Sequence, residues 1–168
     1  MKTPLYWIPG PWNGRLATAP RPRGGDWLDD EIGGWKSEGI TIVVSTLTKS
    51  EAAHLDLDRE GLVCKTAGIE FHQFPIPDVT VPESTQHVSV FLRPLERKLV
   101  DGASLVVHCR MGIGRSSTLA ACLLILAGVS PDDAFARICI ARGCAVPDTQ
   151  EQRRWVEAFA TDRNLRSA

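Results

Sequence analysis

The chain has 168 residues, of which 43% are hydrophobic and 23% are charged, and its net charge at pH 7 is −1. This length favours a single domain over residues 1–168, and the balanced charge gives no reason to expect a nucleic-acid or anionic-membrane partner. No signal-peptide pattern opens the chain, and the longest apolar run, residues 119–128, is too short to cross a bilayer. We therefore expect a cytoplasmic monomer without nucleic-acid or membrane partners.

The five cysteines are scattered, odd in number and without the Cys-x-x-Cys spacing of a zinc or redox site. Neither a disulfide scaffold nor a zinc site is therefore expected. Two histidines, His54 and His87, fall on expected helices far from any second ligand candidate. The sequence thus predicts no metal and no cofactor, and a reducing compartment suits its thiols.

The first half of the chain alternates short apolar runs with polar segments that can cap helices. Residues 9–25 are rich in proline, glycine and arginine, which predicts a functional surface loop or a short hairpin. The arginines of this segment can help to admit an anionic substrate, although solvated loop charge is the simpler interpretation. The other elements expected here are a strand over 5–8, a helix capped by Asp26, a strand over 40–46, a helix from a Ser50 cap to about Asp58, a connection over 61–68 and a strand over 70–76.

The second half is more strongly patterned. Apolar residues recur at helical spacing over 83–100, where Pro94 predicts a kink or a break. Residues 117–127 are apolar nearly all round, which is typical of a buried helix. The remaining elements are a short apolar strand over 105–107, a helix capped by Ser130 with Pro131 at its first position and Gly143 at its end, and a last helix that begins at an Asp148–Glu151 capping box and runs to about Asp162.

Strands and helices alternate throughout, and this order predicts an α/β fold. We expect one domain with a central, mostly parallel sheet of about four or five strands and with helices on both faces. In such folds, ligands bind at the carboxyl ends of the strands. The strand over 105–107 ends at this edge, directly before the most informative stretch of the chain.

Residues 108–116 have the layout of a phosphate-binding loop. The chain leaves a buried strand, passes two glycines and enters an apolar helix, so that its amides face one volume at the positive end of the helix dipole. Gly112 and Gly114 can take backbone angles that side chains resist. Cys109 starts the loop and Arg115 lies at the helix entrance, where a thiolate is stabilised and a guanidinium can grip two anion oxygens. The amides that would cradle the anion belong to Arg110, Met111, Gly112, Ile113 and Gly114.

The residues His108-Cys109-x5-Arg115-Ser116 resemble the signature of the cysteine-dependent protein phosphatases. With so short a chain, the sequence is most similar to their compact dual-specificity branch, which includes small bacterial members. The resemblance implies that the Cys109 thiolate attacks phosphorus to give a phosphocysteine and that Arg115 holds phosphate oxygens. It also implies that Ser116 donates to the cysteine sulfur, while His108 orients the backbone around the thiol. A plain buried core cysteine would explain neither Arg115 nor the glycines.

The phosphatase reaction needs a carboxylic acid that protonates the leaving oxygen. Asp78 is the candidate, because it follows the strand that ends at Ile76, on a loop over 77–82. It also precedes Cys109 by about the separation at which the resembling family carries its general acid. An ordinary turn aspartate is the alternative interpretation of Asp78, and Glu83 is the fallback acid.

Related enzymes use a glutamine to position the water of the second step. Residues 148–152 offer two, Gln150 and Gln152. Gln152 aligns better with the dual-specificity pattern, but the motif is short and both remain candidates. Ser117 departs from the family, which more often has glycine there, and we expect little consequence.

The substrate class is less sharply indicated. Deep phosphotyrosine-specific pockets in the family are lined by an aromatic residue on a dedicated loop, and this chain has a single tyrosine, Tyr6. We therefore expect a shallower pocket that accepts phosphotyrosine and phosphoserine or phosphothreonine on a protein or peptide. Lipid phosphatases of the wider family carry lysines inside the loop, so that an inositol lipid is less favoured, although Arg110 keeps it open.

Two other functions remain open on the sequence alone. A rhodanese-type sulfurtransferase also places a cysteine at the head of an anion loop, but its loop differs in size and it needs no general acid. A non-catalytic phosphate-binding module would use the same cradle, yet binding alone requires neither Cys109 nor Asp78. The sequence favours a phosphoprotein phosphatase over both.

Overall fold

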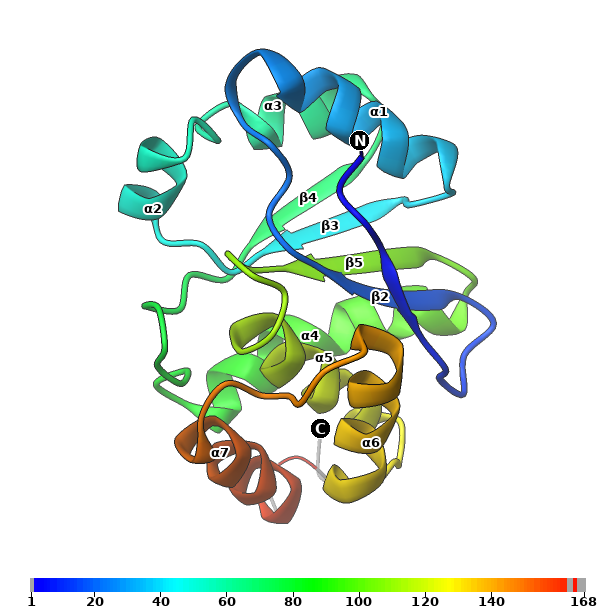
Figure 1. The fold of residues 1–168 in the computed structure, drawn as a ribbon. Coiled ribbons are helices and arrows are strands. Elements are labelled where there is room, and N and C mark those ends of the chain that lie inside the picture. Colours follow the sequence, from blue (N-terminus) through cyan, green and yellow to red (C-terminus); the bar gives the residue numbers. More distant parts are fainter. Residues whose placement is uncertain (1, 163–164, 166–168) are drawn as a thin grey trace.

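A five-stranded sheet runs through the part of the chain that the computed structural model describes, residues 2–162 and 165 (Figure 1). Its strand order is β1-β2-β5-β3-β4. β1 and β2 pair antiparallel, whereas β2, β5, β3 and β4 are parallel to one another. The strands are β1 (Tyr6–Ile8), β2 (Arg15–Ala19), β3 (Ile42–Ser45), β4 (Glu70–Gln73) and β5 (Ser104–His108).

Helices cover both faces of this sheet, and each layer closes its own apolar core. In Figure 1, α1, α2 and α3 lie above the sheet and α4 to α7 lie below it. This arrangement confirms the predicted α/β class with a mostly parallel sheet. None of the described helices is both long enough and apolar enough to cross a membrane. The helices are α1 (Leu28–Ser37), α2 (Lys49–His54), α3 (Glu60–Thr66), α4 (Thr85–Val100), α5 (Arg115–Leu126), α6 (Pro131–Arg142) and α7 (Gln150–Thr161).

β5 is the middle strand, and it sets the position of the site. All five of its residues are buried, as its continuous apolar run predicts for a strand that is covered on both faces. His108, its last residue, is in register with Ala19 of β2 and with Ser45 of β3. The chain then passes through residues 109–114 into α5, whose first ten residues are all buried. The predicted phosphate-binding loop therefore lies at the carboxyl edge of the sheet, between two neighbouring strand ends.

Two segments of the first half differ from the simplest expectation. Residues 9–25 are not one loop, because β2 lies within them and forms with β1 the short hairpin that was the alternative. Residues 61–68 are not a plain connection, because most of them belong to α3. α3 has only seven residues, too few to show a helical repeat, and its buried Val63 and Cys64 indicate that packing against the sheet stabilises it.

The N-caps of two helices, α2 and α7, fall on other residues than expected. α2 begins after Thr48 and not after Ser50, and α7 begins after Thr149 and not after Asp148. In both cases the cap that forms completes a reciprocal capping box with a side chain three residues on. The residue three positions after Ser50 is Ala53, whose side chain cannot complete a capping box. The predicted box from Asp148 to Glu151 lies one residue before the box that forms between Thr149 and Gln152.

Among the remaining helix boundaries, the start of α1 differs from the expectation, whereas both ends of α6 agree with it. α1 follows a 3-10 turn over Gly25–Trp27, without a side-chain cap from Asp26. α6 begins and ends as predicted, since the Ser130 hydroxyl accepts a hydrogen bond from the Asp133 amide and Gly143 has a φ of 76°. α4 continues through Pro94 without the break that was one of the two expected outcomes.

Candidate active site

The loop that follows β5 wraps around the sulfur of Cys109. This residue is 3% exposed, and its Sγ accepts a hydrogen bond from the Gly112 amide at 3.2 Å. The Ser116 hydroxyl lies 3.3 Å from the same sulfur, on the first turn of α5. Gly112 has a φ of +70°, and a Cβ there would come within 2.6 Å of the backbone of Ala19. Only glycine fits this close approach of the loop to β2.

Arg115 is held beside this loop by a carboxylate from a distant helix. Its guanidinium is almost fully buried, and its two terminal nitrogens donate to the two carboxylate oxygens of Glu51 at 2.8 and 2.9 Å. Nη1 also donates to the carbonyl oxygen of Ile76 at 2.9 Å. Burial pushes the pKa of Glu51 up, but the hydrogen bonds from Arg115 and from the Thr48 amide outweigh it, so that the pKa lies below its ordinary value. Arg115 is therefore fixed in place as part of a charged pair.

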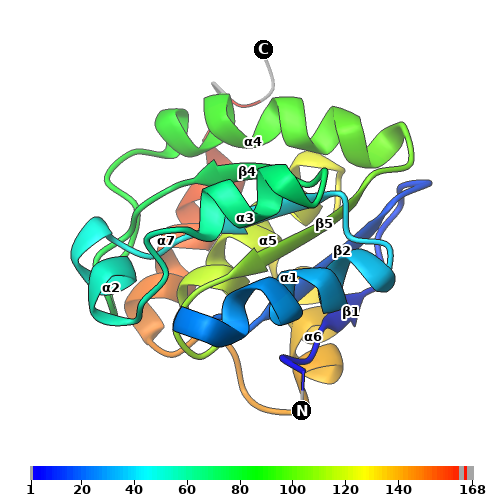
Figure 2. The ribbon, with the colours of Figure 1, turned by 90° about the horizontal axis from the view of Figure 1, so that it is seen from above.

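Asp78 comes to the same guanidinium from the loop after β4. Its Oδ1 lies 2.9 Å from Nη2 of Arg115, and half of its side chain is exposed. The loop itself is turned by hydrogen bonds from Thr80 to the carbonyl of Pro77. Figure 2 shows α2 and the segment between β4 and α4 at the same edge of the sheet. Glu83, the fallback acid, lines a pocket together with Phe74 and His87, and neither Cys109 nor Arg115 lines that pocket.

The two candidate glutamines differ sharply in their surroundings. Gln152 is fully buried, whereas Gln150 is exposed. The amide oxygen of Gln152 accepts from the backbone amide of Thr149, and its amide nitrogen donates to the Thr80 carbonyl at 3.3 Å. A Cβ on Gly114 would come within 2.8 Å of the Gln152 amide, so that this side chain lies against the phosphate-binding loop. Gln152 therefore links α7, this loop and the Asp78 loop.

The loop residues between Cys109 and Arg115 form the rim of the site. Met111 is 59% exposed, and Val79 of the Asp78 loop is 54% exposed. Arg110 is partly exposed, with its Nε 3.8 Å from a Glu51 oxygen, and Ile113 is half-buried. The rim thus combines apolar side chains with one cation.

Three residues of the site region were missed by sequence reasoning. Glu51 anchors Arg115, as described above, and its signal was the Thr-x-x-Glu capping box that begins at Thr48. Glu60 of α3 lies 2.7 Å from Nε2 of His108, on a helix that was not expected. Arg142 donates to the carbonyl oxygens of Met111 and Gly112 from α6, and nothing in the sequence indicated this contact.

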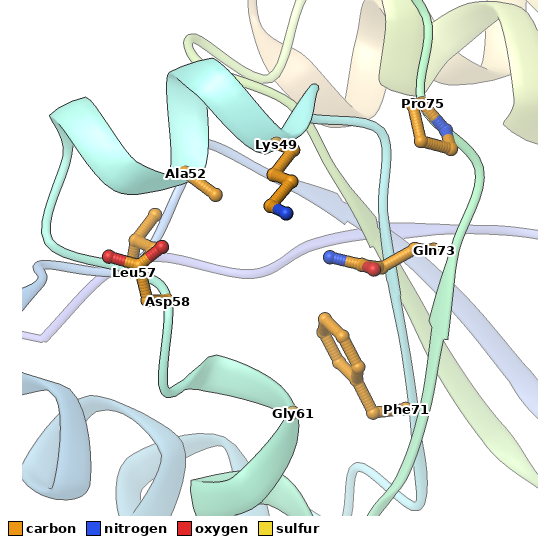
Figure 3. Close-up of a pocket in the computed structure, with 8 residues that line it drawn as sticks. All are labelled: Lys49, Ala52, Leu57, Asp58, Gly61, Phe71, Gln73 and Pro75. Carbon is orange, nitrogen blue, oxygen red and sulfur yellow. The ribbon is translucent and has the colours of Figure 1, made fainter.

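A pocket of about 430 Å³ lies apart from the cysteine, between α2, α3 and β4 (Figure 3). In Figure 3, Phe71 and Gln73 extend from β4 towards Lys49 and Ala52 of α2. α2 therefore contributes Glu51 to the Arg115 anchor and other side chains to this pocket. Neither Cys109 nor Arg115 lines this pocket, so that it is separate from the candidate active site.

The fold and the loop define the class of the protein, and comparison with known families specifies it. A cysteine after a central parallel strand, a loop amide that donates to its sulfur and a buried arginine at the helix entrance are the features of a cysteine-dependent phosphatase site. A protein-family model described as "Polymorphic toxin system, DSP-PTPase phosphatase" matches residues 18–129, which include Asp78 and the whole phosphate-binding loop. The chain belongs to this DSP-PTPase family.

Individual proteins and solved structures are also similar to the chain. The chain is 30% identical over 126 residues to cyclin-dependent kinase inhibitor 3 of Sus scrofa, an alignment that covers 74% of this chain and 59% of that protein. It thus spans about six tenths of the length of the curated relatives it matches. A crystal structure of kinase associated phosphatase, with its catalytic-site cysteine replaced by serine, has the same fold at a TM-score of 0.89 and 21% identity, covering 100% of this chain and 98% of the other. Tk-PTP in its active form gives a TM-score of 0.72 at 26% identity, covering 88% and 92%.

Proposed function

We propose that this protein hydrolyses phosphate monoesters on phosphorylated proteins or peptides through a phosphocysteine intermediate, without a metal. The observation that carries the proposal is the convergence of three side chains, two from the loop over 108–116 and one from the loop after β4. Cys109 lies at the bottom of the amide cradle, Arg115 lies beside it, and Asp78 reaches Arg115 at 2.9 Å. Membership of a phosphatase family supports the same reaction.

In the first step, the Cys109 thiolate attacks phosphorus. A sulfur–phosphorus bond forms and the bond to the leaving oxygen breaks, while protonated Asp78 gives that oxygen its proton. The loop amides and Arg115 hold the non-bridging oxygens, where charge is redistributed during transfer. Asp78 Oδ1 lies 2.9 Å from Nη2 of Arg115, which places the acid beside the guanidinium that would hold the phosphate.

In the second step, a water attacks the phosphocysteine. Its proton passes to the Asp78 carboxylate, the sulfur–phosphorus bond breaks, and inorganic phosphate leaves. Ser116 is 3.3 Å from the sulfur, and its hydroxyl can donate a hydrogen bond that stabilises the departing thiolate. The Gln152 amide bonds to the backbone of both Thr149 and Thr80, and through Thr80 it supports the Asp78 loop. To position the water of the second step, Gln152 would release one of these two hydrogen bonds.

The rim supports a protein or peptide substrate. Exposed Met111 and Val79 offer apolar contacts to a phosphotyrosine ring, and neither closes the site to phosphoserine or phosphothreonine. The five cysteines are free thiols, which suits the reducing cytoplasm in which we place the reaction.

The presence of an acid separates this proposal from the two alternatives. A sulfurtransferase forms a persulfide and protonates no leaving oxygen, so that it has no use for Asp78. A phosphate-binding module needs the cradle and Arg115 but no nucleophile. The three residues Cys109, Arg115 and Asp78 together are required only for hydrolysis.

The test is hydrolysis of para-nitrophenyl phosphate in EDTA by the wild type and by two cysteine variants. We expect metal-independent turnover that Cys109→Ser abolishes and that Cys139→Ser, a matched change outside the site, leaves intact. Vanadate should inhibit the wild type. A wild type without turnover that still binds a phosphopeptide would refute the phosphatase proposal in favour of a binding module.

A further inference from the structure

A buried carboxylate–imidazole pair lies directly behind the cysteine. Nε2 of His108 is 2.7 Å from Oε1 of Glu60, the first residue of α3. His108 is fully buried and Glu60 is 2% exposed. A carboxylate in such a place is costly unless it is paired, and a helix from the opposite face of the sheet supplies it to the residue that precedes Cys109.

The two nitrogens of the His108 ring face two different oxygens. Its Nδ1 faces the carbonyl oxygen of Cys109 at 3.5 Å, a long contact, while Nε2 faces the Glu60 carboxylate at 2.7 Å. Carbonyl and carboxylate oxygens only accept hydrogen bonds, so that the ring lies between two acceptors. Trp35 of α1 packs against the ring, with the two ring centres 5.9 Å apart, and helps to keep it in this orientation.

We propose that Glu60 is a positioning residue for the reaction proposed above. Its carboxylate fixes the ring of His108, and the ring in turn holds the Cys109 carbonyl, so that the residue that carries the nucleophile keeps its orientation at the start of the loop. Glu60 itself touches neither the phosphate nor the sulfur. The proposal deepens the phosphatase function and rests on it, but the state of the thiol can be measured without turnover.

Few other groups around the pair titrate. α3 presents Cys64, whose pKa burial raises to about 12, with the Glu60 charge adding to the effect, so that it stays a neutral thiol at neutral pH. α1 presents Trp35, and the register neighbours of His108 on β2 and β3 are Ala19 and Ser45. Cys109 follows the ring directly in the chain, and its carbonyl faces Nδ1. Among the described residues, Glu60 therefore has its direct contact with His108 and acts on Cys109 through the ring.

The experiment measures the rate at which iodoacetamide modifies Cys109 at about pH 6, followed by peptide mass spectrometry so that the other four cysteines do not interfere. We expect Glu60→Gln, which keeps the shape and removes the charge, to slow this modification about tenfold, the size of effect that follows from weakening a hydrogen bond to a charged group. It should lower kcat by a similar factor with KM little changed. Glu60→Asp, which restores a carboxylate, should recover part of both losses.

Two controls separate positioning from stability. Glu31→Gln removes another buried carboxylate, one that pairs with Arg23 and Thr3, and should lower the melting temperature without changing the modification rate. In a His108→Gln background, Glu60→Gln should have no further effect on the rate, because Glu60 acts through the imidazole.

Modification of Cys109 in Glu60→Gln within about twofold of the wild type would overturn the proposal, even if activity fell. If Glu60→Gln does not fold, Glu60→Asp is judged by the same rate, with a slowing of more than about twofold expected. Slower modification in a protein that shows no phosphatase turnover would support the role of Glu60 and refute the proposed function, so that the two failures are distinguishable.

Discussion

The Arg115 anchor leads to a sharp prediction about Glu51. Glu51→Gln removes the charge that pairs with a guanidinium of only 2% exposure and replaces one accepting oxygen by an NH2 group that faces Arg115. A hydrogen bond to a charged group contributes roughly 1.5–3 kcal/mol. The contacts of Arg115 with Ile76 and Asp78 remain. We therefore expect the variant to lose about 2 kcal/mol of unfolding free energy, near the middle of that range.

The same change should lower catalysis, because an unanchored Arg115 no longer meets the phosphate in a fixed orientation. A loss of about 2 kcal/mol in transition-state stabilisation corresponds to roughly a thirtyfold fall in kcat/KM. Urea unfolding and para-nitrophenyl phosphate kinetics measure the two effects. Thr48→Ala is the matched control: it removes the side-chain cap of α2, at about 1 kcal/mol, and leaves the Glu51 carboxylate on Arg115. A Glu51→Gln enzyme with kcat/KM within about twofold of Thr48→Ala would refute the reasoning.

The pH dependence of stability gives a second readout for Glu51. Its pKa in the folded protein is lowered from the ordinary 4.5, so that the unfolded chain binds the proton more readily than the folded one. The stabilisation is therefore complete above pH 4.5 and is lost as the pH falls through the lower, folded-state pKa. The difference in unfolding free energy between the wild type and Glu51→Gln should shrink as the pH falls below 4.5. A difference that stays constant through this range would contradict the assignment.

Three further predictions concern the cysteine loop and the acid. Asp78→Asn should lower kcat by roughly 10²–10⁴-fold and leave vanadate binding at least as tight, because the amide cannot donate the required proton and competes less for Arg115; unchanged kcat would identify another acid. Gly112→Ala should destabilise the fold by about 1–3 kcal/mol in urea unfolding, since its Cβ would come within 2.6 Å of the Ala19 backbone at a φ of +70°; an unaffected midpoint would count against the described loop. Ser116→Ala should give a larger pre-steady-state burst and a slower steady rate, because its hydroxyl assists only the departure of the thiolate; equal loss of both phases would place its role in the first step.

The cysteine loop was predictable from the sequence because its determinants are local. A strand, a cysteine, two glycines, an arginine and the start of an apolar helix follow one another over residues 104–117, and each constrains the backbone next to it. The position of Asp78 also followed, since parallel strands place their carboxyl ends at one edge of the sheet. β3 pairs in parallel with both β4 and β5, so that the ends of these three strands lie at the same edge.

The supporting residues were not predictable in the same way, because their partners are far apart in the chain. Glu51 and Arg115 are 64 positions apart, and Glu60 and His108 are 48 apart. Periodicity in a six- or seven-residue helix is too short to reveal which side chain faces the sheet. Gln152 shows the limit most clearly: the sequence indicated a glutamine near the site, but not that both of its polar atoms are already bonded.

Trapping the phosphocysteine intermediate tests the proposed reaction most directly. Wild type and Ser116→Ala are mixed with para-nitrophenyl phosphate in EDTA, quenched with acid within the burst, and digested for peptide mass spectrometry. We expect one phosphoryl group on the peptide that contains Cys109, in greater amount in Ser116→Ala and absent in Cys109→Ser. Turnover without phosphoryl on Cys109, or with phosphoryl on another side chain, would contradict it.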